Sequence, residues 1–246
     1  MALGIREKGL KGLGRLAAYW GAGSDLERLV AAHQGDRLFK WRHYYEVYER
    51  HFGRRRGRPI TLLEIGVANG GSLALWRKYF GPQAQLVGVD IEPDCRQYAG
   101  PGVAIAIGSQ GDPEFLRRLA AEHGPFDIVI DDGSHIYEHQ RVTFETLFPH
   151  IKADGLYVCE DLHTSYRTDG EFGGGLRRPG TFVEFLKEQI DELNAWFWRE
   201  KVEEEPHALA RVVHGIHFYP TLVVIEKRPS APPVVAHVGS RLRRRL

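Results

Sequence analysis

The sequence predicts an α/β fold: a doubly wound, mostly parallel sheet that ends in a C-terminal antiparallel hairpin. Short apolar runs alternate with amphipathic segments between residues 61 and 160, which is the pattern of parallel strands joined by helices. Two of these runs, 126–131 and 155–160, end in adjacent acids. Two further runs, 212–218 and 221–227, turn around Pro220 and predict the hairpin.

The overall composition excludes several classes of protein. The 246 residues carry 33 basic and 32 acidic side chains, so a net charge of +1 gives no general attraction to nucleic acid. No apolar run approaches the roughly 18 residues of a membrane-spanning helix. Cys95 and Cys159 are too few for a disulfide framework and fit a reducing cytoplasm. We therefore expect a cytoplasmic protein with no nucleic-acid partner and no membrane span.

Three regions are expected along the chain. Residues 1–55 form an N-terminal helical arm or cap, residues 56–228 a single domain, and residues 229–246 a disordered basic tail. Within the arm, the Gly-rich stretch 1–23 predicts a loosely held segment or an oligomer contact. Ser24 is suited to cap a helix that runs to about His33. The arm and the aromatic helices described below favour a homodimer or a larger homo-oligomer.

Aromatic side chains recur at helical spacing after the first predicted helix, at Trp41, Tyr44, Tyr45, Tyr48 and Phe52. This spacing predicts a helix packed on the sheet. In the alternative interpretation, the start of this segment, around residues 36–44, also closes over a ligand. The arginines between residues 54 and 58 predict a solvated loop.

The central part of the chain then alternates strands with helices. Asp112 is suited to cap one of the helices, with Pro113 at its first position. The expected strands span 61–67, 85–90, 103–107, 126–131 and 155–160, and the expected helices open at Leu73 and span 112–122 and 138–148.

A long Gly-rich loop over residues 162–180 is typical of a lid. An amphipathic helix is expected from Thr181 to about Glu205. Its aromatic residues Phe182, Trp196 and Trp198 favour core or oligomer packing over stacking on a sugar.

Acidic residues follow two strands that are expected to lie near one another. Asp131 and Asp132 end one strand, and Glu160 and Asp161 end the other. Four carboxylates at neighbouring strand ends would repel one another unless a cation neutralised them, so the pattern predicts a site for a hard metal ion. The alternative is that these acids only stabilise the turns after the strands, since D-D-G-S is also a favourable turn sequence.

The turn after the first strand indicates a nucleoside-type ligand. The stretch E-I-G-V-A-N-G-G-S lacks the glycine spacing of dinucleotide binders and the lysine of a phosphate-binding loop. An acid in the first strand, Glu64, a glycine turn, and an acid ending the second strand, Asp90, are the pattern of S-adenosylmethionine (SAM) binders. Asp90 is placed to bind a ribose diol, and the alternative is that it is only a turn residue.

Several stretches together resemble a known family. They are L-L-E-I-G-V-A-N-G-G-S, G-V-D-I-E-P, F-D-I-V-I-D-D-G-S-H and L-Y-V-C-E-D-L-H-T-S-Y. This chain resembles the magnesium-dependent sugar O-methyltransferases of macrolide and aromatic-polyketide pathways, whose relatives include chains called cephalosporin hydroxylases. The resemblance runs from about Asp36 to Lys227 and implies the Rossmann-like fold of class I SAM-dependent methyltransferases.

The resemblance also implies roles for individual residues. The metal ligands would be Asp132, Glu160 and Asp161, and His135 would be the general base. For His135, a buried structural role or a water-mediated role is the alternative. The SAM site would be lined by Glu64, Gly66, Ser72, Asp90, Gln110 and Asp131, and the acceptor pocket would be shaped by His163, Thr164, Ser165 and Tyr166. The chain departs from the family pattern at Ser109, where relatives commonly have an acid, and at Arg167, where they often have an aromatic residue.

The implied function is methyl transfer from SAM to a hydroxyl of a sugar on a natural product, polysaccharide or glycolipid. Carboxylate ligands favour Mg²⁺, with Mn²⁺ as the expected substitute. A catechol-like or other small vicinal diol is the alternative acceptor. A non-catalytic SAM-binding protein is a second alternative, and a NAD-linked enzyme is disfavoured by the glycine spacing.

Overall fold

The computed structural model describes residues 23–169, 172–197 and 211–239. Its centre is a seven-stranded sheet in the order β3-β2-β1-β4-β5-β7-β6. The first five strands along the chain pair in parallel, and β7 pairs antiparallel with both β5 and β6. The predicted fold class is therefore confirmed. The strands are β1 Thr61–Ile65, β2 Gln85–Asp90, β3 Val103–Ile107, β4 Phe126–Asp131, β5 Ile151–Cys159, β6 Val213–Tyr219 and β7 Leu222–Lys227.

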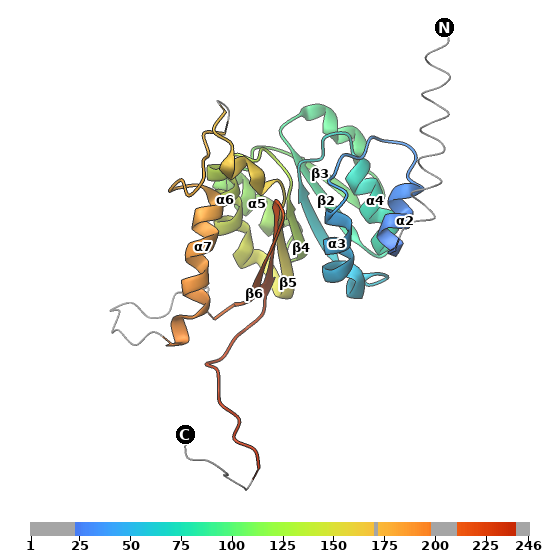
Figure 1. Cartoon of the computed structure of the whole chain (residues 1–246). Helices are drawn as coiled ribbons and strands as arrows, with labels where there is room; N and C mark the ends of the chain where they lie inside the picture. Colours follow the sequence, from blue (N-terminus) through green and yellow to red (C-terminus); the bar gives the residue numbers. More distant parts are fainter. Residues whose placement is uncertain (1–22, 170–171, 198–210, 240–246) are drawn as a thin grey trace.

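Helices cover both faces of this sheet, as Figure 1 shows. One face is covered by α2 Asp25–Ala31, α3 Tyr44–Phe52 and α4 Gly71–Phe80, and the other by α5 Pro113–His123, α6 Tyr137–Leu147 and α7 Phe182–Leu193. Single 3₁₀ turns are η1 Gly53–Arg55, η2 Pro93–Tyr98, η3 Phe148–His150, η4 Leu162–Tyr166 and η5 Ala195–Phe197.

The strands divide their side chains between two hydrophobic cores. In β1, for example, Leu62 belongs to the core under α3 and α4, and Leu63 belongs to the core under α5 and α6. The alternation follows from the two-residue period of a strand, and it explains why these strands read as continuous apolar runs. Among the described residues, no helix is long and apolar enough to cross a membrane.

Local sequence signals set several element boundaries as predicted. The Ser24 side chain accepts a hydrogen bond from the backbone N–H of Glu27, whose own side chain accepts the backbone N–H of Ser24, so α2 begins with a capping box. Asp112 caps α5 by accepting hydrogen bonds from two backbone N–H groups.

Other boundaries differ from the predictions. Helix α7 ends at Leu193 rather than near residue 205, because Asn194 leaves the helical conformation and a 3₁₀ turn follows; residues 198–210 lie outside the described residues. Strand β5 starts at Ile151. Trp41 precedes α3 instead of lying within it.

The arginine run is only partly solvated. Arg55 is buried, and its guanidinium donates hydrogen bonds to the backbone carbonyls of His51 and Asp154, which links α3 to the start of β5. The predicted solvated loop was wrong for Arg55, because the run continues from α3 as the turn η1 and turns one arginine inward.

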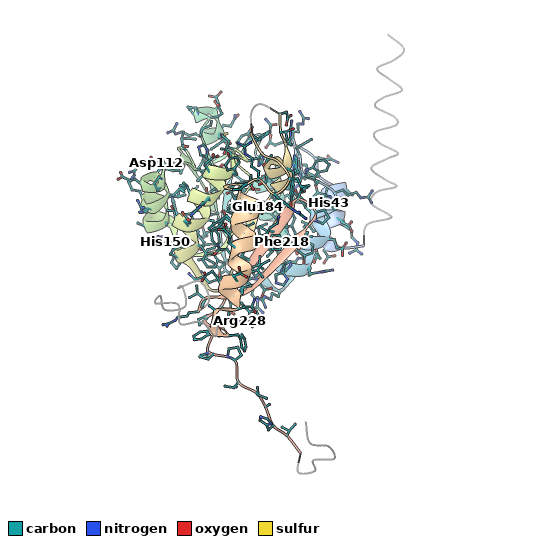
Figure 2. All side chains as sticks on the ribbon, turned by 60° about the vertical axis from the view of Figure 1, so that its left-hand side comes forward. His43, Asp112, His150, Glu184, Phe218 and Arg228 are labelled. Carbon is teal, nitrogen blue, oxygen red and sulfur yellow. The ribbon has the colours of Figure 1, made fainter. Side chains whose placement is uncertain are left out.

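The two ends of the chain carry the remaining predictions. Of the arm predicted over residues 1–55, residues 1–22 lie outside the described residues, and so do residues 240–246 of the predicted tail. Residues 229–239 form no helix or strand and are exposed, and the chain leaves the sheet after Arg228, which is labelled in Figure 2.

Candidate active site

A cavity of about 590 Å³ opens at the carboxyl edge of the parallel strands. Its walls come from the turns after β1, β2, β3, β4 and β5 and from the segment before α3. This position is where open α/β sheets bind their ligands. The residues that line it include Phe39, Lys40, Trp41, Gly66, Ala68, Asp90, Ile91, Gly108, Ser109, Gln110, Asp132, His135, His139, Glu160 and Asp161.

The two predicted acid pairs meet at this edge because β4 lies between β1 and β5. The backbone N–H of Asp132 donates to the carbonyl of Ile65 over 3.0 Å, and the N–H of Glu160 donates to the carbonyl of Asp131 over 2.9 Å. These two bonds continue the ladder past the strand ends. The carboxylates of Asp132, Glu160 and Asp161 therefore reach the same cavity.

A lysine that sequence reasoning missed lies among these acids. Lys40 belongs to an irregular segment, residues 36–43, that we call the strap, and its side chain is only 1% exposed. Its Nζ atom lies 2.7 Å from Asp132 Oδ2, 2.6 Å from Glu160 Oε1 and 3.3 Å from Glu64 Oε1. Burial alone would lower the pKa of Lys40, but the three carboxylates raise it well above its usual value. The ammonium group is thus a permanent counter-charge inside the cluster.

Burial and the neighbouring Asp132 raise the pKa of Glu160 to about 8, against the opposing effect of Lys40. Tyr48, on α3, donates a short hydrogen bond to Glu160.

The strap and α3 also hold the fourth acid. Asp161 Oδ1 accepts hydrogen bonds from Trp41 Nε1 and from the Tyr44 hydroxyl, each over 2.9 Å. The predicted packing of the aromatic helix on the sheet is confirmed, since Tyr44 and Tyr48 are fully buried. The same segment also forms one wall of the cavity, through Phe39, Lys40 and Trp41.

Candidate metal-ligand atoms form two groups around Asp132 in the described part of the chain. Asp132 groups with His135 and Asp161 on the side of the cavity, and with Glu64 and Glu160 around the Lys40 ammonium. The three acids predicted as ligands are therefore divided between two groups that share Asp132.

His135 lies at the cavity in a strained backbone conformation. Its φ is +57°, and Asp161, which faces it, has a φ of +55°. Such left-handed residues cost roughly 1–3 kcal/mol each and cluster at functional sites. The Nε2 atom of His135 lies 3.6 Å from Asp161 Oδ2, and its buried Nδ1 atom has no hydrogen-bond partner among the described residues. Thr164 donates a hydrogen bond to the His135 carbonyl, which holds the backbone in this conformation.

The other end of the cavity is formed by the glycine turn and the ends of β2 and β3. Asp90 accepts hydrogen bonds from the backbone N–H groups of Ala68 and Glu92, over 2.8 and 3.0 Å, so it orders the turn as well as lining the cavity. Gln110 is buried, and both polar ends of its side chain form hydrogen bonds within the protein. Its amide nitrogen donates to the Asp131 carboxylate and the Thr143 hydroxyl. Its carbonyl accepts the N–H of Ser134.

Three residues predicted at the SAM site, Glu64, Ser72 and Asp131, lie behind the cavity wall rather than in its lining. Glu64 is buried on β1, where it accepts hydrogen bonds from Ser72 and Trp76. Asp131 is buried between Gln110 and Tyr157, and burial raises its pKa to about 6. These residues support the side chains that line the cavity.

The predicted acceptor residues lie on η4, directly after Asp161. Thr164 and Ser165 are buried, Tyr166 is exposed, and His163 Nδ1 lies 3.8 Å from Asp161 Oδ1. They stand next to the cavity rather than in its lining.

Gly66 allows the first turn to pass against the acidic loop. Its φ is +95°, and a Cβ atom there would collide with the carbonyl of Asp132, well inside the 3.0 Å that real Cβ atoms keep. We expect Gly66→Ala to lower the free energy of unfolding by about 2–5 kcal/mol, the sum of left-handed strain and overpacking. Urea unfolding measures this. Gly57→Ala is the matched control, since Gly57 has a φ of +68° with open space around it and should lose only about 1–2 kcal/mol. Equal losses in the two variants would show that the contact with Asp132 contributes nothing.

Comparison with known proteins agrees with this geometry. Residues 63–162 match the family described as a methyltransferase domain, and this range includes nearly all of the parallel part of the sheet and all of the cavity lining except Phe39, Lys40 and Trp41. The chain carries a class I methyltransferase domain. Within this domain, the family match spans the strands from β1 to β5 and includes both acid pairs.

Two curated relatives of the methyltransferase domain are named as O-methyltransferases of rhamnosylated tetracenomycins. Over 211 residues the chain is 41% identical to the 8-demethyl-8-(2-methoxy-alpha-L-rhamnosyl)-tetracenomycin-C 3'-O-methyltransferase of Streptomyces olivaceus, covering 82% of this chain and 54% of that protein. It is also 41% identical, over 210 residues, to the 8-demethyl-8-alpha-L-rhamnosyl tetracenomycin-C 2'-O-methyltransferase of the same organism, covering 81% and 53%.

Among solved structures, the chain is similar to the MycE methyltransferase from the mycinamycin biosynthetic pathway in complex with Mg and SAH. The TM-score is 0.76 at 35% identity, over 85% of this chain and 55% of that one. The methyltransferase domain is thus homologous to sugar O-methyltransferases of the tetracenomycin and mycinamicin type, and the chain spans about half the length of these relatives.

Proposed function

We propose that this chain is an O-methyltransferase that uses SAM and Mg²⁺ to methylate a hydroxyl of a sugar. The observation that carries the proposal is the shared cavity. One end has the glycine turn and Asp90, and the other has Asp132, His135 and Asp161. A cofactor bound at the first end would direct its methyl group toward the second. The homology to sugar O-methyltransferases supports the same activity.

The side chains at the second end suit a magnesium ion. Asp132, Glu160 and Asp161 line the cavity with carboxylate oxygens, the ligands that Mg²⁺ prefers. We propose these three acids as its ligands, with Glu160 leaving the Lys40 ammonium to reach the ion, because its oxygens group with Asp132 and not with Asp161. Bound there, the ion would act as a Lewis acid and as a template for vicinal hydroxyls. The similar MycE methyltransferase was solved in complex with Mg, which supports the choice of ion.

The side chains at the first end suit SAM. Asp90 keeps its carboxylate at the cavity while it orders the turn, and we propose that it binds the ribose hydroxyls. Gly66, Gly108 and Ser109 bring backbone close to the ligand, and Ile91 offers an apolar surface for the adenine ring. Glu64, Ser72, Gln110 and Asp131 would hold this wall in place through their mutual hydrogen bonds.

We propose His135 as the general base. A sugar hydroxyl is a poor acid, so the reaction needs a proton acceptor near the acceptor oxygen, and imidazole titrates near neutral pH. His135 lines the cavity, and the carboxylate of Asp161 faces its Nε2 atom. Because His135 also groups with Asp132 and Asp161, direct metal ligation is the competing role. The metal affinity of a His135 variant separates the two roles, since only a ligand would lower it.

The relatives agree on a sugar as the acceptor but not on which of its hydroxyls is methylated. Two relatives that are each 41% identical to this chain carry names that place the methyl group at different positions, 3' and 2'. Overall identity therefore does not choose the hydroxyl. The strap residues Phe39 and Trp41, with His163 and Tyr166 of η4, are our candidates for contacts with the sugar and its aglycone.

The test is methyl transfer by the purified chain to three acceptors: a rhamnosylated aromatic polyketide, a macrolide glycoside and a simple catechol. We expect product from at least one glycoside, at least about 100-fold less from catechol, and no product when EDTA is present. Added Mg²⁺ should restore the activity, because the ion polarises the acceptor hydroxyl.

The other outcomes each point to a different function. Preferential methylation of catechol would replace the sugar with a small vicinal diol. Full activity in EDTA would remove the metal from the proposal. Binding of S-adenosylhomocysteine without transfer to any acceptor would favour a non-catalytic SAM-binding protein.

A further inference from the structure

A second cluster of metal-ligand side chains lies at the C-terminal end of α3, away from the four acids. His51 comes from the last turn of α3, His217 from β6 and Glu226 from β7. One ligand atom from each lies within 4.8 Å of the other two. The two strand residues share a face of the sheet, because Gly215 pairs with Glu226 and His217 is two residues further along β6.

The contacts in this cluster are not those of an ordinary hydrogen-bonded network. His51 Nδ1 lies 3.6 Å from Glu226 Oε1, which is too long for a hydrogen bond. His217 Nε2 lies 3.3 Å from the same oxygen; this atom is covered and has no hydrogen-bond partner among the described residues, although the His217 side chain as a whole is 40% exposed. The two ring nitrogens and the carboxylate oxygen therefore lie close together without forming hydrogen bonds with one another.

The outer nitrogen of His51 already has a partner. Its Nε2 atom lies 2.9 Å from the hydroxyl of Tyr219. When Nε2 carries the proton and donates it to Tyr219, the lone pair of Nδ1 faces Glu226 and His217. Histidines that bind metals are usually fixed by such an outer hydrogen bond.

The spacing fits a tetrahedral zinc ion. Zinc binds imidazole nitrogen and carboxylate oxygen at about 2.0–2.2 Å, so neighbouring ligands in a tetrahedron lie about 3.3–3.6 Å apart. The observed separations from Glu226 are 3.3 and 3.6 Å. Two imidazoles and one carboxylate select a borderline transition metal over Mg²⁺. We propose that His51, His217 and Glu226 form a second metal site for Zn²⁺, with water in the fourth position.

An ion at this position would connect α3 to the antiparallel hairpin. His51 lies two helical turns after Tyr44, which binds Asp161, and one turn after Tyr48, which binds Glu160. The zinc ion would therefore brace the helix that holds the acids of the cavity. The inference is independent of the proposed methyl transfer, since it requires neither SAM nor an acceptor.

The experiment is a Zn²⁺ titration by isothermal calorimetry, on the tag-free full chain with Asp132→Asn. This substitution removes the residue that both groups at the cavity share, so it limits competition from that end. We expect about one equivalent of Zn²⁺ to bind, with a rise in Tm of about 5–10 °C at a free Zn²⁺ concentration of 100 times Kd. A large excess of Mg²⁺ should not displace it.

Two further variants localise the ion. Adding His217→Gln should weaken Zn²⁺ binding by about 100-fold or more, because one of three ligands is lost. Adding His214→Gln should leave the affinity unchanged, since His214 lies on the same strand but faces Arg228. Glu226→Gln replaces His217→Gln if the latter lacks a cooperative thermal transition. No Zn²⁺ binding in the parent, or undiminished binding in the variant that lacks His217 or Glu226, would overturn the site.

Discussion

Replacing His135 with alanine is expected to lower kcat by about 10²–10⁴-fold, the usual contribution of a general base. The dissociation constants for Mg²⁺ and S-adenosylhomocysteine should change by less than about threefold, since in this role the imidazole accepts a proton and does not hold the ion. Steady-state methyl transfer at saturating SAM and acceptor measures the first quantity. Calorimetry with Mg²⁺, or the electron paramagnetic resonance of bound Mn²⁺, measures the second.

A nearby histidine provides the control for the His135 variant. His139 also lines the cavity, but its Nδ1 atom is engaged with the hydroxyl of Ser134. His139→Ala removes a ring of the same size, and we expect less than a tenfold effect on kcat. If His135→Ala instead weakens metal binding in step with kcat, His135 is a ligand. If methylation is undiminished, His135 has no part in the chemistry.

Replacing Lys40 with methionine should destabilise the protein by about 3–5 kcal/mol in the absence of metal, the usual cost of removing one partner from a buried ion pair. Methionine keeps most of the volume, so the loss measures the charge. Without the ammonium group, Glu64, Asp132 and Glu160 remain close together with no counter-charge. Urea unfolding in EDTA gives the free energy of unfolding.

Two comparisons make the Lys40 result specific. Lys152→Met removes a lysine that lies 2.7 Å from Asp127 but is 38% exposed, and it should cost about 1 kcal/mol or less. Added Mg²⁺ should recover more stability in the Lys40 variant than in the wild type, because the ion would supply the missing positive charge. An unfolding midpoint that does not change on removal of Lys40 would contradict its role as counter-charge.

The sequence predicted the parts of this fold that depend on local patterns. The caps at Ser24 and Asp112, the strand over 126–131 and the hairpin around Pro220 each have a signal within a few residues, and the structure confirms them. The end of α7 was placed too late, because the helical spacing of apolar residues continues past Asn194, whereas the backbone leaves the helical conformation there.

The candidate site was likewise only partly predictable from the sequence. The acids were found because strand ends in a parallel sheet meet at one edge. Lys40 was missed because its partners Asp132 and Glu160 are 92 and 120 residues away in sequence, and no local pattern marks such a contact. The one available signal was the aromatic segment that follows it, which indicated a second role for residues 36–44.

The strap combines two properties that protein engineers would wish to vary separately. Phe39 and Trp41 line the cavity in which we propose that the acceptor binds, whereas Lys40, between them, supplies a positive charge to Asp132 and Glu160. Exchanging this segment for that of a relative to obtain a new glycoside preference would also exchange the charge at the core. Chimeras that keep a lysine at position 40 and diversify its two neighbours should therefore give altered acceptor selectivity without loss of turnover.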